Sequence, residues 1–170
     1  MYIITIARMK TPLYYASINN RLDATVLLLD NGASMSNIKM MGDIIEIASR
    51  RGYINIVTLL IDRGLHKINS VSRYHSIRLA ILARNIPMVR LLVKTFGDIV
   101  IINGPPRDQA YHTWDVVSII RNACDKGDIK LIEGLIDAGM KFKYFRGDLI
   151  SHMRETGNNE LAQLLTNVDS

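Results

Sequence analysis

The chain has 170 residues, of which 48% are hydrophobic and 22% charged, which is typical of one folded domain and excludes an intrinsically disordered chain. Its formal net charge of +5 favours an acidic partner, but the basic residues are spread along the sequence and accompany no nucleic-acid-binding motif. No apolar run approaches the roughly 18–20 residues of a membrane-spanning helix, and the first residues lack the pattern of a secretory signal. The single cysteine, Cys124, allows no internal disulfide, which favours the cytoplasm, with the nucleus as an alternative.

Residues 1–10 precede the first predicted helix and hold the position of a connection in the repeat described below. Tyr2, Ile3 and Ile4 make this segment apolar. We expect these side chains either to cover the open face of the first helical hairpin or to pair with another chain. The second alternative predicts self-association through the N-terminal repeat face.

A repeated unit organises the rest of the chain, and it is clearest from Asp43 to Gly64. Two apolar patterns at helical spacing are separated there by a turn that contains Gly52, which predicts two short helices. Such a hairpin is apolar on too many sides to be stable without neighbours. Within one domain of residues 1–170, the units cover approximately residues 11–36, 43–68, 75–97, 118–141 and 148–166.

Equivalent positions of the units hold similar residues, and we call each such set of positions a column. Three of these columns have a physical explanation. A small residue in the first helix recurs at a spacing of 32 residues and then less regularly, as Ala16, Ala48, Ala80 and Ala123, with Met153 in this position of the fifth unit. The expected helix starts mostly have capping side chains: Thr11, Asp43, His75, Ser118 and Asp148. The turn between the helices mostly has residues that accept a left-handed backbone, with arginine as the departure: Asn20, Gly52, Arg84, Gly127 and Gly157.

The first unit, TPLYYASINNRLDATVLLLDNGAS, resembles the ankyrin-repeat pattern T-P-L-H-x-A, G-H, I-V-x-L-L-L and G-A. The resemblance covers about residues 11–166 and implies an all-α ankyrin-repeat solenoid of stacked helical hairpins with short β-hairpin-like connections. The histidine of the family pattern is Tyr14 here and is replaced in the other units too, so we do not expect the family's hydroxyl–imidazole network. The composition also resembles ankyrin proteins of large DNA viruses, which would place the protein in the host cytoplasm.

The resemblance implies a protein partner on the concave face, which the exposed ends of the first helices and the tips of the connections form. The candidates just before the turns are Ile18, Asn19, Arg50, Arg51, Leu82 and Lys126. The candidates at the tips are Met40, Met41 and Tyr74, because methionine and tyrosine suit interfaces. Ile18 and Leu82 either anchor the partner or pack on an adjacent hairpin.

A long insertion separates the third unit from the fourth, and we predict a loop over residues 98–113. Tyr111 and Trp114 lie at its end, and Arg107 is nearby. Aromatic residues and arginine are common anchors of interfaces, so this loop is a second candidate for partner binding. In the alternative interpretation, Tyr111 and Trp114 fold back and fill the gap beside the irregular third unit.

The sequence shows no pattern for catalysis, metal binding or a cofactor. The four histidines have no metal-ligand spacing, and we expect His75 to cap a helix. Cys124 follows the alanine column, which predicts a buried structural thiol rather than a nucleophile. We therefore predict a non-catalytic protein–protein interaction module or adaptor without membrane contact. The alternatives are a self-associating structural protein and, less favoured, a basic nucleic-acid-binding protein.

Overall fold

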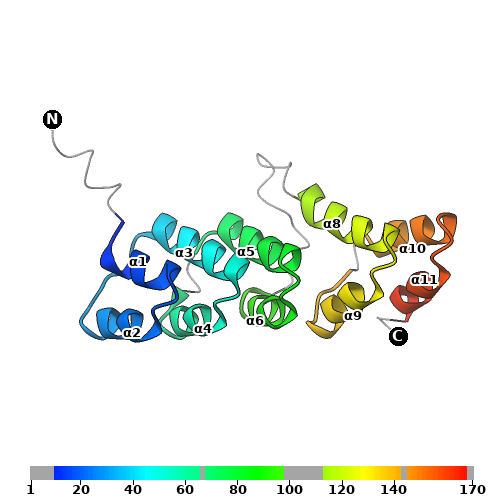
Figure 1. Ribbon diagram of the computed structural model, residues 1–170. Helices are drawn as coiled ribbons and strands as arrows, with labels where there is room; N and C mark the ends of the chain where they lie inside the picture. The colour runs from blue at the N-terminus through cyan, green and yellow to red at the C-terminus, as the bar shows by residue number, and fades with distance from the viewer. Residues whose placement is uncertain (1–9, 66–67, 98–112, 143–144, 168–170) are drawn as a thin grey trace.

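A computed structural model describes residues 10–65, 68–97, 113–142 and 145–167 of the chain. Within these ranges the chain forms helices and no strand (Figure 1). The helices form successive hairpins, which are α1 Pro12–Ile18 with α2 Leu22–Asp30, α3 Ile38–Arg51 with α4 Ile54–Asp62, α5 Ser70–Leu82 with α6 Ile86–Phe96, α8 Thr113–Asp125 with α9 Ile129–Asp137, and α10 Arg146–Glu155 with α11 Asn159–Thr166.

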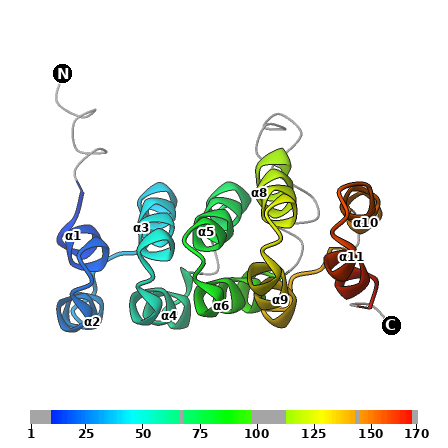
Figure 2. The same cartoon turned by 45° about the vertical axis from the view of Figure 1, so that its right-hand side comes forward.

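The hairpins stack side by side into an elongated solenoid of two layers. Figure 2 shows the first helices of the hairpins (α1, α3, α5, α8 and α10) in one layer and the second helices below them. The predicted helical solenoid is therefore confirmed. The expected β-hairpin-like connections are not found where the structure describes the connections; residues 31–37, for example, join α2 to α3 without a strand.

The first helices of the second and third hairpins begin one turn or more earlier than expected. Asn37 caps α3, since its Oδ1 accepts a hydrogen bond of 3.0 Å from the N–H of Met40. Asn69 caps α5 in the same way, at 2.8 Å from the N–H of Ser72. The predicted cap Thr11 is confirmed at α1. The predicted starts at Asp43, His75 and Ser118 are wrong, because these residues lie inside helices, and Asp148 lies in the first turn of α10.

This error has a simple cause. The helix starts of the later units were predicted by aligning them with the first unit. In that unit Thr11 is the N-cap, and Pro12 is the first residue of α1. The second and third units have no proline at this place, so their helices extend back to asparagines that are themselves 32 residues apart. Longer helices leave fewer residues for the connections, which also explains the missing β-hairpins.

The core is formed by the small-residue column and by the apolar faces around it. All five members of that column are buried, from Ala16 at 8% exposure to Ala48, Ala80 and Met153 at 0%. Cys124, next to this column, is also 0% exposed, and burial together with the adjacent Asp125 raises its pKa to about 12. The thiol is therefore protonated at neutral pH, as a structural cysteine should be.

The turn column has the predicted left-handed backbone in every hairpin. The glycines at positions 52, 127 and 157 have φ of 74°, 63° and 82°. Asn20 and Arg84 adopt the same conformation with φ of 57° and 55°, although side chains disfavour it. The turn is thus imposed by the two helices that it joins, and it reverses the chain at the same place in each unit.

Candidate functional site

The candidate site lies where the first helices end. Each left-handed turn stops a first helix after an equivalent residue, so the last residues of α1, α3, α5 and α8 follow one another along one side of the solenoid (Figure 1). We call this row the turn edge; it comprises Ile18, Asn19, Arg50, Arg51, Leu82, Ala83, Asp125 and Lys126. Its backbone belongs to helix ends, so the fold fixes the points from which its side chains extend.

Burial separates the two apolar candidates of the turn edge. Ile18 is half-buried and packs against the core, whereas Leu82 is 50% exposed. Asn19, Arg50, Arg51 and Lys126 are exposed. Leu82 is therefore the apolar side chain that this edge offers to solvent.

Arg50 and Arg51 are adjacent in sequence but have different surroundings. Arg51 Nη1 donates a hydrogen bond of 2.8 Å to the carbonyl oxygen of Ile18, at the end of α1. This contact satisfies one of the carbonyls that a helix end leaves without a partner, and it joins the first two hairpins. Within the part of the chain that the structure describes, Arg50 makes no hydrogen bond or ion pair.

Three residues expected at exposed tips are buried instead, and the prediction of their exposure is wrong. Met40, Met41 and Tyr74 are 6%, 2% and 1% exposed, because the early starts of α3 and α5 place them inside helices. Tyr74 has a structural role: its hydroxyl accepts a hydrogen bond of 3.3 Å from the N–H of Val116. That N–H is in the first turn of α8, so the hydrogen bond joins the third hairpin to the fourth.

Part of the predicted insertion site lies outside the described residues, namely Arg107, Tyr111 and the loop of residues 98–112. Residue 113 already begins α8, and Trp114 belongs to that helix, although its side chain is outside the description. Whether this segment binds a partner or fills a gap stays a prediction.

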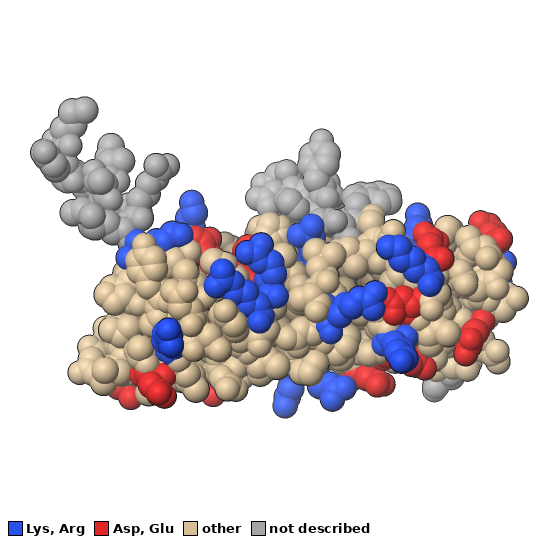
Figure 3. All heavy atoms as spheres, in the orientation of Figure 1, with Lys and Arg blue, Asp and Glu red and all other residues tan. Residues whose placement is uncertain are grey.

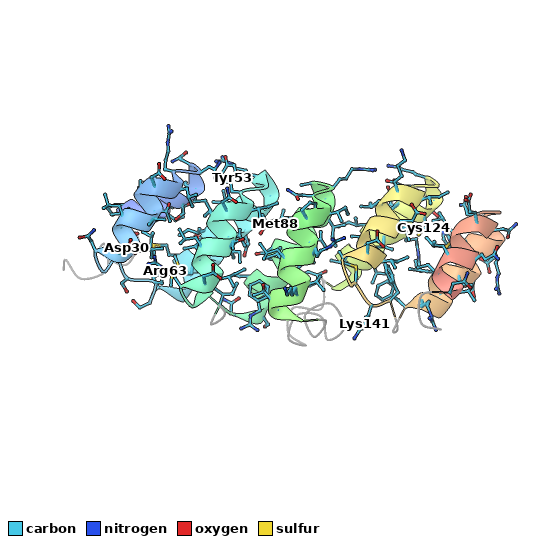
Figure 4. The ribbon with its side chains drawn as sticks, turned by 90° about the horizontal axis from the view of Figure 1, so that it is seen from below. Asp30, Tyr53, Arg63, Met88, Cys124 and Lys141 are labelled. Carbon is cyan, nitrogen blue, oxygen red and sulfur yellow. The ribbon has the colours of Figure 1, made fainter. Side chains whose placement is uncertain are left out.

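Contacts between basic and acidic side chains, which the sequence analysis missed, join neighbouring hairpins. Their partners come from successive units: Arg63 with Asp30 (2.7 Å, Figure 4), His75 with Glu46 (3.7 Å), Arg84 with Asp128, and His152 with Asp125. His75 thus faces the preceding hairpin from inside α5, and the prediction that it caps a helix is wrong. Basic and acidic residues in successive units, at separations of 27 to 44 residues, were the available signal. Exposed pairs of this kind each contribute at most about 1 kcal/mol to stability.

The basic residues are spread along the sequence, but the positive net charge is concentrated in one stretch. Residues 63–97 contain no aspartate or glutamate and have seven basic residues, namely Arg63, Lys67, Arg73, Arg78, Arg84, Arg90 and Lys94. Because the whole chain has a net charge of +5, this stretch holds all of the excess. The third hairpin is therefore the positive part of the molecule, and Figure 3 shows one face along which many lysine and arginine side chains lie.

A shallow pocket of about 340 Å³ lies along α6, the second helix of the third hairpin. Ile86, Pro87, Arg90, Leu91 and Lys94 line it, so it is mostly apolar with two basic side chains. Among the described residues no group of three or more histidine, cysteine, aspartate or glutamate side chains is placed to hold a metal ion. No helix in the described ranges has the length and apolar character needed to cross a membrane.

Stacked helical hairpins with a left-handed turn in each define a helical repeat protein, and a comparison with known families identifies the kind of repeat at its start. The ankyrin-repeat family model matches residues 9–40. The first hairpin therefore matches an ankyrin repeat, and the chain resembles the ankyrin-repeat family. Proteins of this family are generally protein–protein interaction modules and typically have no enzymatic activity.

The chain is similar to the putative ankyrin repeat protein R837 of Acanthamoeba polyphaga mimivirus, with 33% identity over 61 residues. This match covers 36% of the chain and 10% of that relative. The chain thus aligns with about a tenth of the length of the viral protein. No solved structure matches the chain.

Proposed function

We propose that the chain is a non-catalytic interaction module that binds a protein partner at its turn edge. The observation that carries the proposal is the 50% exposure of Leu82 in an inner hairpin, beside arginines of the preceding hairpin. An exposed leucine alone is common on protein surfaces, but one in a row of fixed, mostly polar side chains is a typical anchor of an interface. The reduced, buried thiol of Cys124 suits action in the cytoplasm, or in the host cytoplasm if the protein is viral.

The fold supports this function because the site is preorganised. The side chains of the turn edge extend from helix ends that the stacked hairpins fix in place, so docking orders little backbone. Nothing in the proposal requires a cofactor, a metal or a reacting side chain. It requires only a partner whose surface is complementary to the apolar side chain of Leu82 and to the charged and amide side chains around it.

A photo-crosslinking amino acid at Ala83, which is exposed and next to Leu82, tests this proposal. In a lysate of the cells that make the protein, we expect one specific covalent adduct, identified by mass spectrometry. A control carries the same group at Glu133, which is exposed on α9 outside the turn edge, and it should not give this adduct. Equal labelling from both positions, or no adduct from Ala83, would contradict binding at the turn edge.

A second candidate function is self-association, and the first hairpin favours it. Tyr15 and Leu27 are 53% and 64% exposed. Leu59 and Leu91 hold the place of Leu27 in the next two hairpins, and they are half-buried. The first hairpin therefore exposes apolar surface that inner hairpins cover by stacking.

We expect Leu27→Lys to abolish any dimer that forms through this face, because the lysine would have to lose its hydration in the contact. Light scattering coupled to size-exclusion chromatography at two protein concentrations measures the mass. Leu82→Lys is the matched control, since it changes an equally apolar exposed residue elsewhere. A mass equal to one chain at both concentrations would exclude self-association, and a dimer that survives Leu27→Lys would place the contact on another face.

A further inference from the structure

The charges of the turn edge indicate which kind of segment it would bind. In the first three turns, at residues 19–21, 50–53 and 82–85, there are four arginines and no acidic residue. They are Arg21, Arg50, Arg51 and Arg84, and all four are exposed. The formal charge of these three turns is therefore entirely positive.

Contacts within the protein neutralise only part of this charge. Arg84 pairs with Asp128 of the next hairpin. Arg51 donates to the carbonyl oxygen of Ile18, a neutral group, so its charge is not compensated. Glu46, one helical turn before Arg50, lies 3.7 Å from His75 instead. Among the described residues, no carboxylate pairs with Arg50 or Arg51, so both remain available to one from outside.

The exposed leucine lies next to this charge. Leu82 holds in the third hairpin the place that Arg50 holds in the second, 32 residues earlier. Their helices, α5 and α3, lie side by side in both views of the ribbon (Figures 1 and 2). The turn edge thus places an apolar contact beside a basic one at the spacing of one repeat.

We propose that the turn edge around Arg50 and Leu82 recognises an acidic segment of a partner protein in which carboxylate side chains flank an aliphatic residue. This inference rests on the proposed function and adds the chemistry of the partner. The carboxylates would pair with Arg50 and Arg51, because guanidinium groups match carboxylate geometry, and the aliphatic side chain would cover Leu82. The acid-free stretch of residues 63–97 adds a positive field that attracts such a segment.

A nucleic acid fits these observations less well than an acidic peptide. Several basic side chains of residues 63–97 are engaged within the protein, since Arg63 pairs with Asp30, Arg84 pairs with Asp128, and Arg73 lies 5.4 Å from the centre of the Phe96 ring. A half-exposed leucine at the centre of the site has no phosphate-binding role. It suits a side chain of a protein.

A phage-displayed library of random 16-residue peptides, selected on the intact chain, tests the inference. We expect enriched sequences with two or more acidic residues around a leucine, isoleucine or valine. A synthetic peptide of the most enriched sequence should bind about tenfold more weakly to Arg50→Glu and to Leu82→Ser, and its affinity should fall with added salt. A copy with every acidic residue replaced by its amide should also lose binding.

Arg90→Glu is the matched control, because it makes the same charge reversal at an exposed residue of the α6 pocket. It should bind the peptide like the unchanged protein. Enrichment of neutral or basic sequences, no enrichment, or equal loss from Arg50→Glu and Arg90→Glu would overturn the inference. So would preferential binding of a 16-nucleotide single-stranded DNA at the same residues. An adduct from Ala83 in the cross-linking experiment would still support the proposed function in each of these cases.

Discussion

Replacing Tyr74 with alanine is expected to lower the free energy of unfolding by about 3–5 kcal/mol, the range for truncating a buried aromatic side chain. Tyr74 is 1% exposed and is among the largest fully buried side chains. Its ring fills space beside α8, and its hydroxyl accepts from Val116 of that helix. The substitution removes packing and a hydrogen bond from the same contact between the third and fourth hairpins.

The effect should also change how the protein unfolds. A hairpin of a solenoid contacts only its neighbours, so cooperativity passes from one hairpin to the next through such contacts. In Tyr74→Ala, α8 to α11 should therefore unfold separately from α1 to α6. Urea unfolding followed by circular dichroism should show two transitions in place of one, and hydrogen exchange should assign the weaker transition to one side of the contact.

Tyr74→Phe separates the hydroxyl from the ring. It keeps the packing and removes the hydrogen bond to the N–H of Val116, which should cost about 0.5–1.5 kcal/mol. A single sharp transition should remain. If Tyr74→Ala costs no more than Tyr74→Phe, the ring does not join the two hairpins, and the structural role assigned to Tyr74 is wrong.

The sequence predicts most reliably those parts of the fold that depend on one residue and its nearest neighbours. The small-residue column is buried throughout, because this face of each first helix packs against the neighbouring helices. The turn column is left-handed even at Arg84, the residue that fits the pattern worst. Here the regular spacing of the repeat was better evidence than the preference of a single residue.

The helix starts were harder to predict because several capping residues compete in each unit. Asp43 could cap a helix, but so could Asn37, and the structure uses Asn37 because the residues between them extend the helix. This choice decides whether Met40 and Tyr74 are exposed tips or core residues. An error of about five residues in a helix start therefore became an error in the predicted site.

Exposure within the turn edge could not be read from the sequence for a different reason. Ile18 and Leu82 hold equivalent places, yet only Leu82 is half exposed. Arg51 of the second hairpin donates a hydrogen bond to the carbonyl oxygen of Ile18 in the first. Lys126 of the fourth hairpin holds the equivalent position relative to Leu82 in the third. In the described part of the chain, Lys126 makes no such contact with Leu82. Which side chain is covered depends on its neighbour in space, and the sequence of one unit does not contain that information.

Gly52→Ala should lower the free energy of unfolding by about 2–3 kcal/mol. Gly52 has φ of 74°, a conformation that costs a residue with a side chain roughly 1–2 kcal/mol. A β-carbon at this position would also lie 2.6 Å from Nδ2 of Asn85. The Oδ1 atom of Asn85 caps α6 by accepting from Met88, so displacing this side chain should cost about 1 kcal/mol more.

Gly127→Ala is the matched control, since Gly127 is the equivalent turn residue with φ of 63°, and a β-carbon added there would have no atom within 4 Å. It should show only the backbone cost of about 1–2 kcal/mol. Asn85→Ala completes the test in a double-mutant cycle: it should destabilise the unchanged protein by about 1 kcal/mol, but much less in the Gly52→Ala background, where the cap is already displaced. Additive effects would mean that the cap tolerates the new methyl group, and the turn of the second hairpin would then be limited by its backbone alone.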